Sequence, residues 1–181
     1  TVVGDNAKRL KEAIEMAESR ADMIIFTGGL GPTKDDLTKH TIATHLKKEL
    51  TYNEDALIVI QEFFEKVKRP MTDNNRQQAL VLDGCKVLTN RYGLAPGMYI
   101  ENDTHTYLLF PGPPKELQPM FLTEARPLLV EKIQGDAKIV SHMLRFYGIG
   151  EAELETKVQH LLDAQTNPTI APLASEGEVA I

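Results

Sequence analysis

The sequence predicts an α/β fold with a largely parallel sheet, followed by a small α+β appendage. Short apolar runs typical of buried strands alternate along the chain with segments of helical periodicity. Turns rich in glycine and proline follow two of these runs. The composition changes near Gly135, where a second pattern of strand, helix and strand begins. We therefore expect one domain over residues 1–134 and a small one over residues 135–181.

The first elements are a helix and a strand. A helix is expected from Asn6 onward, because apolar residues recur there every three or four positions. Asp5 or Asn6 can cap its start. The run 23–26 is continuously apolar, as in strands buried on both faces. A glycine-rich turn follows at 28–33, and the next helix is expected to begin at residues 35–36.

The middle of the chain predicts a longer helix from about Asn53 that ends at Arg69-Pro70, with Ile60 and Phe63 on its apolar side. Asn102-Asp103 is typical of a hairpin turn. The remaining elements expected before the second domain are a short helix at 73–80, short strands at 86–88, 98–100 and 107–110, and a helix beyond Pro114.

The second domain is expected to begin with a long strand over 138–147, which Gly148-Ile149-Gly150 ends. A helix marked by Leu154 and Leu161 follows, and another strand is expected to begin near Thr169.

Composition excludes several classes of protein. The 181 residues are 42% hydrophobic and 25% charged, which is typical of a globular chain. The net charge of −6 argues against nucleic acid as a partner, because phosphate-backbone affinity depends on Lys and Arg. Cys85 is the only cysteine, which excludes an internal disulfide and fits the cytoplasm. No apolar run approaches the ~20 residues of a membrane helix, so no membrane partner is expected.

The first glycine-rich turn is a candidate anion site. Gly28, Gly29 and Gly31 follow a predicted strand and precede a helix, an arrangement that points backbone N–H groups at an anion. Lys34 stands where a Rossmann fingerprint needs Gly or Ala, and the chain has no Gly-Lys-Ser/Thr of a P-loop. The turn therefore predicts phosphate binding without either standard motif.

Two carboxylates follow this turn. Asp35 and Asp36 could hold a hard divalent cation such as Mg²⁺ next to a phosphate. A capping box of Thr33 and Asp36 explains the same spacing. Both can hold, because adjacent helix residues point in different directions.

A second turn has similar features. Pro111-Gly112-Pro113-Pro114 follows a predicted strand, and Lys115 could reach an anion from the next helix. The alternative is a stiff loop with a solvated lysine. Because ligands collect beyond the carboxyl ends of strands in open α/β sheets, we expect the two turns to share one edge and one site.

Other polar residues carry weaker signals. Asn75 and Arg76 could contact a ligand, but Asx residues at a helix start usually cap it. The five histidines lack the spacing of a metal pair and are interpreted as surface or structural residues. Cys85 is interpreted as a small buried hydrophobe.

Several longer motifs add a family resemblance. The segment 28–38, Gly-Gly-Leu-Gly-Pro-Thr-Lys-Asp-Asp-Leu-Thr, closely resembles the N-terminal domain of the competence/damage-inducible CinA family. The other motifs that carry the resemblance are Val3-Gly4-Asp5-Asn6, Arg69-Pro70-Met71, Asn74 to Ala79, Ala95-Pro96-Gly97, Pro111 to Glu116, Gly148-Ile149-Gly150-Glu151 and Asn167-Pro168-Thr169. The resemblance implies a three-layer α/β sandwich like the MoaB/MogA domains of molybdenum-cofactor biosynthesis.

The resemblance also implies an activity. CinA-like proteins are associated with a metal-dependent pyrophosphatase that acts on ADP-ribose, so we expect a small-molecule nucleotide substrate, a divalent metal and a homodimer. The expected phosphate-binding residues are Gly28, Gly29, Gly31, Thr33 and Gly112, with Asn75 and Arg76 beside them. Asp35 or Asp36 would hold the metal, and Lys115 would supply a second cation.

Two alternatives stay open. One is pterin binding and adenylylation, as in molybdenum-cofactor assembly, and the other is a non-catalytic nucleotide-sensing or scaffold module. The family also places a strand and a helix before Thr1, and their turn is expected to form one wall of the site. A deamidase domain, which many members carry, is not expected in this chain.

Overall fold

The computed structural model describes residues 1–133, 139–175 and 177–181, and the chain divides into two compact units. Unit 1 is Thr1–Gln134 and unit 2 is Gly135–Ile181. The boundary expected at Gly135 lies outside the described residues. Among the described residues, no helix combines the length and the apolar character needed to cross a membrane.

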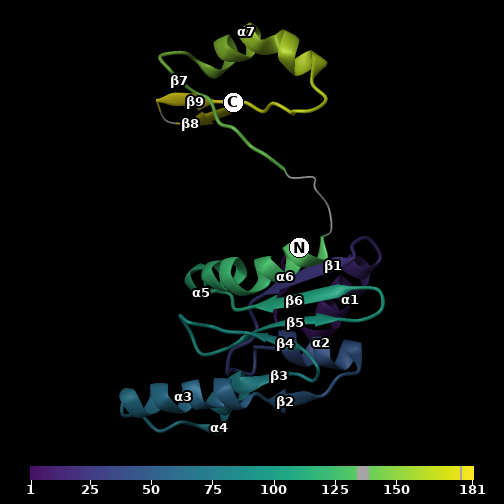
Figure 1. The fold of residues 1–181 in the computed structure, drawn as a ribbon, viewed down its shortest axis with the longest axis vertical. Coiled ribbons are helices and arrows are strands. Elements are labelled where there is room, and N and C mark those ends of the chain that lie inside the picture. Colours follow the sequence, from purple (N-terminus) through teal and green to yellow (C-terminus); the bar gives the residue numbers. More distant parts are fainter. Residues whose placement is uncertain (134–138, 176) are drawn as a thin grey trace. The chain divides into compact units, whose positions relative to one another are not determined.

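A four-stranded mixed sheet forms the centre of unit 1, with the strand order β1-β6-β5-β4 (Figure 1). β1 (Met23–Thr27) runs parallel to β6 (Thr106–Phe110). β5 (Gly97–Glu101) pairs antiparallel with β6 and with β4 (Lys86–Leu88). The α/β class is confirmed, and the parallel pair β1–β6 is the one from which both predicted ligand-binding turns emerge.

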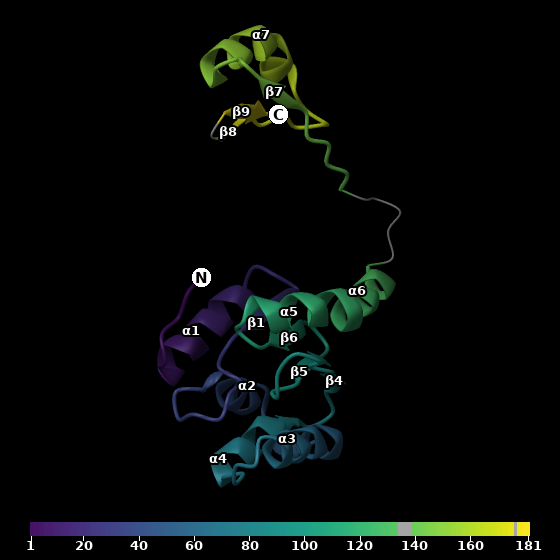
Figure 2. The ribbon, with the colours of Figure 1, turned by 90° about the vertical axis from the view of Figure 1, so that its left-hand side faces the viewer.

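Helices cover both faces of this sheet. On one face lie α1 (Ala7–Glu18) and α2 (Thr38–Leu46), and on the other lie α5 (Pro114–Met120), a π-helical turn (Phe121–Ala125) and α6 (Arg126–Lys132). Side chains of β6 alternate between the two cores: Tyr107 and Leu109 pack with α1 and α2, whereas Leu108 and Phe110 pack with α5 and α6. The expected three layers are confirmed (Figures 1 and 2).

Beyond α2 lies a smaller layer that supports the functional site. Its elements are β2 (Leu50–Tyr52), α3 (Glu54–Lys66), α4 (Asp73–Arg76), a 3₁₀ turn (Gln77–Ala79) and β3 (Leu80–Leu82), which pairs antiparallel with β2. Asn53 caps α3, because its Oδ1 accepts the N–H of Ala56 at 2.9 Å. Ile60 of α3 is buried as expected, but Phe63 on the same side stays partly exposed.

Unit 2 is a three-stranded antiparallel sheet with one helix, so the α+β prediction is confirmed. Its elements are β7 (Arg145–Tyr147), α7 (Glu151–Ala164), β8 (Leu173–Ser175) and β9 (Glu178–Ala180), with the sheet order β7-β9-β8. The strand expected over 138–147 is too long: Lys138 lies outside the described residues, and residues 139–144 are not a strand. The strand expected near Thr169 begins only at Leu173. Apolar runs predict extended chain but do not show which residues find a pairing partner.

Candidate functional site

The two predicted ligand-binding turns meet at the carboxyl end of the parallel pair. Thr27 and Phe110 are the last register partners of β1 and β6, and the N–H of Gly28 donates to the Phe110 carbonyl at 2.9 Å. A Cβ placed on Gly112 would lie only 3.4 Å from the Cα of Gly28. The prediction that both turns share one edge of the sheet is therefore confirmed.

Glycine is required at the first of these turns for two reasons. Gly28 and Gly29 have φ angles of 89° and 70°, in the left-handed region that other residues rarely adopt. A Cβ on Gly29 would also lie 2.1 Å from Oγ1 of Thr38, at the start of α2. The turn thus lies directly against the N-terminus of α2.

Asp36 closes the turn that follows the glycines. Its Oδ2 accepts the Thr33 N–H at 2.9 Å and the Thr33 hydroxyl at 2.7 Å. The helix expected to begin at residues 35–36 is therefore wrong: α2 begins at Thr38, after an N-cap, Leu37, that makes no side-chain hydrogen bond. The Thr33–Asp36 pair forms, but it stabilises a turn ahead of the helix because the carboxylate points back along the chain.

The environment of Asp36 favours its ionised form. Burial by itself raises the pKa of Asp36, but hydrogen bonds from Thr33 and from the backbone of Gly31, together with the charge of Lys39, hold the pKa below its usual value. Asp36 therefore carries a negative charge at neutral pH beside the glycine turn.

Lys39 is a site residue that the sequence analysis missed. Its side chain is only 1% exposed, and its Nζ donates to the carbonyl of Leu30 at 3.4 Å and to the carbonyl of Gln77. Burial lowers the pKa of Lys39 to about 8, although the charge of Asp36 opposes this shift. The lysine thus joins the glycine turn to the 3₁₀ turn 77–79. Its position three residues after Asp36 in a helical segment is the signal that could have found it.

A cavity of about 970 Å³, here called the glycine-turn cavity, opens beside these residues. Gly29, Gly31, Asp36 and Gly112 are the predicted site residues that line it. The other lining residues are Leu30, Val59, Phe63, Gln78, Thr89, Asn90, Arg91, Tyr92, Gly93, Leu94, Ala95, Pro111, Pro113 and Glu116. The cavity therefore has the glycine turns and Asp36 at one side, and apolar, amide and charged side chains elsewhere, the charged ones being Arg91 and Glu116.

The loop 89–95, between β4 and β5, forms one wall and is anchored to α5. The Asn90 amide donates to the Ala95 carbonyl at 2.9 Å and to Glu116 Oε2 at 2.8 Å, while Asn90 Oδ1 accepts the Tyr92 N–H at 3.1 Å. A Cβ on Gly93 would lie 1.9 Å from Glu116 Oε2, so a larger residue there would displace the Glu116 carboxylate from its place beside Asn90. No local spacing in the sequence marks this wall.

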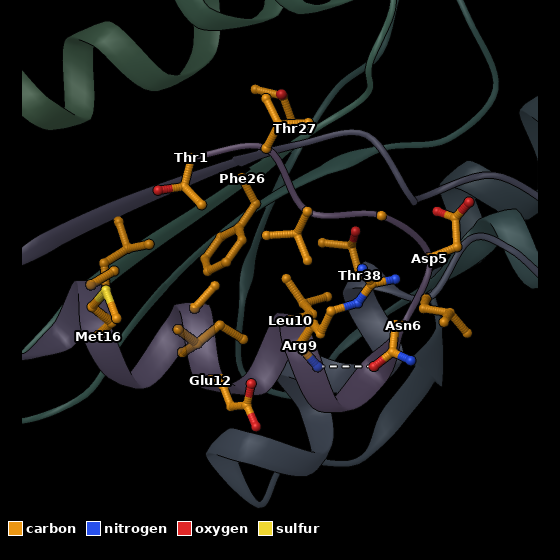
Figure 3. A pocket seen from close by; sticks show the side chains of 18 of the residues that line it. Thr1, Asp5, Asn6, Arg9, Leu10, Glu12, Met16, Phe26, Thr27 and Thr38 are labelled. Atoms are coloured by element: carbon orange, nitrogen blue, oxygen red, sulfur yellow. Dashed lines mark hydrogen bonds between the residues drawn. The ribbon is translucent and has the colours of Figure 1, made fainter.

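A second cavity of about 600 Å³, the N-terminal cavity, lies between residues 1–5, α1, β1 and the residues before α2. Figure 3 shows Asp5, Arg9, Phe26 and Thr38 around it. Asp35 lines this cavity and is absent from the lining of the glycine-turn cavity. The two adjacent carboxylates thus belong to different cavities.

The remaining predicted site residues line neither cavity: Gly28 and Thr33 lie within the glycine turn itself, and Lys115, Asn75 and Arg76 lie elsewhere. Lys115 and Arg76 are exposed, and neither lines either cavity. Asn75 caps α4, because its Oδ1 accepts the Thr72 N–H at 3.0 Å and the Thr72 hydroxyl at 2.7 Å. The capping interpretation of Asn75 is therefore confirmed.

The donor set restricts which metal the site can hold. Among the residues that the structure describes, no group of three or more His, Cys, Asp or Glu side chains is arranged to bind a metal. Mg²⁺ needs only one or two protein carboxylates when waters and ligand phosphates complete its shell. The ionised Asp36 fits that requirement, whereas a closed zinc site would need about four protein ligands.

Comparison with known proteins agrees with this architecture. Residues 1–131 match the family described as probable molybdopterin binding domain, which defines unit 1 as a domain of that class. Residues 141–181 match the damage-inducible protein CinA KH domain. The chain belongs to the CinA family of competence/damage-inducible proteins.

Individual relatives agree with this assignment. The chain is 65% identical over 181 residues to a competence-damage inducible protein of Lysinibacillus sphaericus strain C3-41, and 56% identical to one of Bacillus subtilis strain 168. Both matches cover all of this chain but only 43% and 44% of those proteins, so the chain spans less than half of their length. A CinA protein of unknown function from Thermoplasma acidophilum shares the fold, with a TM-score of 0.60 and 27% identity over 68% of this chain and 72% of that one.

Proposed function

We propose that the complete protein binds a nucleotide with a diphosphate group, such as ADP-ribose, in the glycine-turn cavity and hydrolyses the pyrophosphate bond with a divalent cation such as Mg²⁺. The observation that supports this proposal is the approach of Gly28 to Gly112, beside the ionised Asp36, at the carboxyl end of β1 and β6. This is the edge at which α/β sheets bind phosphorylated ligands.

The glycine turns are suited to phosphate because they offer backbone rather than side chains. In this proposal the Gly29 N–H faces the phosphate oxygens, and the N-terminus of α2 adds its positive dipole. The N–H groups of Gly28 and Thr33 already donate to the Phe110 carbonyl and to Asp36 Oδ2, and the backbone of Gly31 also hydrogen-bonds Asp36, so these residues shape the turn around the phosphates. Gly112 leaves room for the phosphates to approach the backbone of the second turn.

Asp36 is the residue best placed to hold the cation. It lines the glycine-turn cavity, and its Oδ2 is oriented by Thr33. When bound, Mg²⁺ would stabilise the negative charge that develops on the phosphoryl oxygens. Asp35 lines the other cavity and is the second candidate ligand. Lys115, Asn75 and Arg76 would contribute only if ligand binding brings them nearer.

The direct test is release of AMP from ADP-ribose by the complete protein with Mg²⁺. We expect Asp36→Asn to lower turnover by at least about a hundredfold, because a neutral amide binds a hard cation poorly. Loss of its charged contacts with Thr33 costs about 0.5–2 kcal/mol of stability, which a domain of this size survives. Asp83→Asn, an exposed residue outside both cavities, is the matched control.

The outcome separates a metal ligand from a turn-closing residue. If Asp36→Asn melts earlier but keeps full turnover, Asp36 only closes the turn. Asp35→Asn forms a separate arm, in which we expect a smaller loss because Asp35 lines the N-terminal cavity.

Pterin binding is the second candidate, and the match of residues 1–131 to a probable molybdopterin binding domain favours it. An adenylylating enzyme would form an adenylylated pterin from ATP instead of releasing AMP from ADP-ribose. Binding of either compound without turnover would indicate a nucleotide-sensing module.

A further inference from the structure

We propose that Gln78, Phe63 and Tyr92 form a subsite for a flat nitrogen heterocycle, so that the glycine-turn cavity selects ligands that carry such a ring together with their phosphates. The proposal rests on the proposed function, because it places the ring of the same ligand whose phosphates occupy the glycine turns. Phe63 and Tyr92 lie outside the motifs that carry the family resemblance, and Gln78 lies within the motif Asn74 to Ala79 but was not a predicted site residue.

Gln78 is the residue that points to a ligand. It is only 8% exposed and lines the glycine-turn cavity. The Gln78 amide makes no hydrogen bond with any described residue. Every fully buried polar side-chain atom in the described part of the chain has a hydrogen-bond partner, so the amide atoms of Gln78 are not fully buried. The amide atoms therefore keep some accessible surface, and Gln78 is a residue that lines the cavity. A largely buried amide without a protein partner is costly unless water or a ligand satisfies it.

The aromatic side chains supply faces for stacking. Phe63 of α3 and Tyr92 of the loop 89–95 line the same cavity and are 43% and 63% exposed. Tyr92 lies in the loop that Asn90 anchors to Glu116, and its N–H donates to Asn90 Oδ1, so its backbone is held before a ligand arrives. Stacking of a nucleobase on an aromatic side chain contributes about 1–3 kcal/mol.

Lys39 fixes this subsite relative to the phosphate turns. Its Nζ donates to the carbonyls of Leu30, in the glycine turn, and of Gln77, next to Gln78. One buried side chain thus joins the backbone of the glycine turn to the residue that precedes Gln78. The cavity of about 970 Å³ is large enough for a whole nucleotide.

The chemistry of these groups indicates the kind of ring. A carboxamide offers one acceptor and two donors, which match a ring edge with an adjacent donor and acceptor. Adenine has such an edge, and so does a pterin. Both are flat and stack on aromatic side chains, whereas a sugar phosphate without a base has no aromatic face to stack.

The test compares two matched probes on the complete protein by calorimetry. The first is α,β-methylene-ADP, which carries the ring and resists hydrolysis, and the second is methylenediphosphonate, which lacks the ring. We expect Gln78→Met and Tyr92→Leu each to weaken binding of the first probe by about tenfold and to leave the second unchanged. Gln118→Met and Tyr52→Leu repeat these substitutions at exposed residues outside the cavity and should change neither affinity.

The outcomes distinguish this inference from the proposed function. If the unsubstituted protein binds neither probe nor a pterin, both proposals fail. If it binds both probes with equal affinity, or if the Gln78 and Tyr92 variants bind both as the unsubstituted protein does, only the subsite is overturned. Equal weakening of both probes in Gln78→Met also overturns it, because the residue would then only support the fold. Gln78→Glu keeps the size of the side chain and serves if Gln78→Met does not fold. Competition between adenosine and neopterin identifies which ring the subsite prefers.

Discussion

The ammonium group of Lys39 is a buried charge that connects two walls of the glycine-turn cavity. It is held by the carbonyls of Leu30 and Gln77 and lies close enough to Asp36 to affect the pKa of that carboxyl. A buried amine of this kind makes stability depend on pH, because the charged form loses its hydration.

We expect the stability of unit 1 to rise between pH 8 and 10.5 relative to a Lys39→Met variant. The pKa of Lys39 is about 8 in the folded protein and 10.5 ordinarily, so the unfolded state binds more protons in this window. The free energy of unfolding then increases with pH, by about 3 kcal/mol at most. Urea unfolding of both proteins across this range measures the difference. Parallel curves would show that the folded lysine titrates normally.

At the scale of elements, the end of β6 opposite the site joins α1 to α2. The hydroxyl of Tyr107 donates to Glu18 Oε1 at 2.6 Å, and His45 Nε2 lies 2.7 Å from the same oxygen. His105 Nε2 lies 3.0 Å from the Glu18 carbonyl. His45 and His105 are therefore structural, as expected from their spacing. They join α1, α2 and the start of β6 at the end of the sheet opposite the glycine turns.

This network predicts an acid-sensitive contact between α1, α2 and β6. Burial raises the pKa of Glu18, but hydrogen bonds from Tyr107 and His45 lower it by more than burial raises it. The net pKa of Glu18 is therefore below the ordinary 4.5. A lowered carboxyl pKa contributes stability that is present above 4.5 and is lost as pH falls through the folded pKa. We expect Glu18→Gln to be less stable than the unsubstituted protein at pH 7 and to lose less stability on acidification.

Thermal unfolding between pH 7 and 3 measures both effects. Tyr107→Phe is the companion variant, with an expected cost of about 1–3 kcal/mol for the lost hydrogen bond to the Glu18 carboxylate, which keeps its contact with His45. If Glu18→Gln and the unsubstituted protein lose stability in parallel, the carboxylate does not contribute to the acid transition.

For the whole molecule, charge argues against nucleic acid as the ligand of either unit. The chain has 26 acidic and 20 basic residues. Among residues 139–181 of unit 2, the acidic residues outnumber the basic ones, which are Arg145 and Lys157. KH domains hold nucleic acid with a Gly-x-x-Gly loop, but the turn before α7 reads Gly148-Ile149-Gly150 and residues 139–181 contain no such spacing.

We therefore expect no appreciable binding of DNA by the complete protein at physiological salt. Fluorescence anisotropy with labelled single- and double-stranded DNA measures this directly. Submicromolar affinity that falls steeply with added salt would contradict the prediction. The homodimer implied by the family resemblance also stays a prediction, which light scattering can measure.

The sequence by itself determined the α/β class, most helices and strands, and the two glycine turns. These features depend on local patterns: the spacing of apolar residues sets which face is buried, and a turn such as Gly28-Gly29 needs glycine wherever it lies. The family resemblance was likewise carried by contiguous motifs, and the matches of residues 1–131 and 141–181 together confirm it.

Only the tertiary structure decided which side chains share a cavity. It separated Asp35 from Asp36 because the Thr33–Asp36 turn ends before α2 begins. It joined Gln77, the neighbour of Gln78, to the glycine turn through Lys39. It brought Tyr92 to the same cavity as Gln78 through Asn90 and Glu116. These contacts join residues far apart along the chain. They depend on how layers pack around the sheet, and no local spacing encodes that packing.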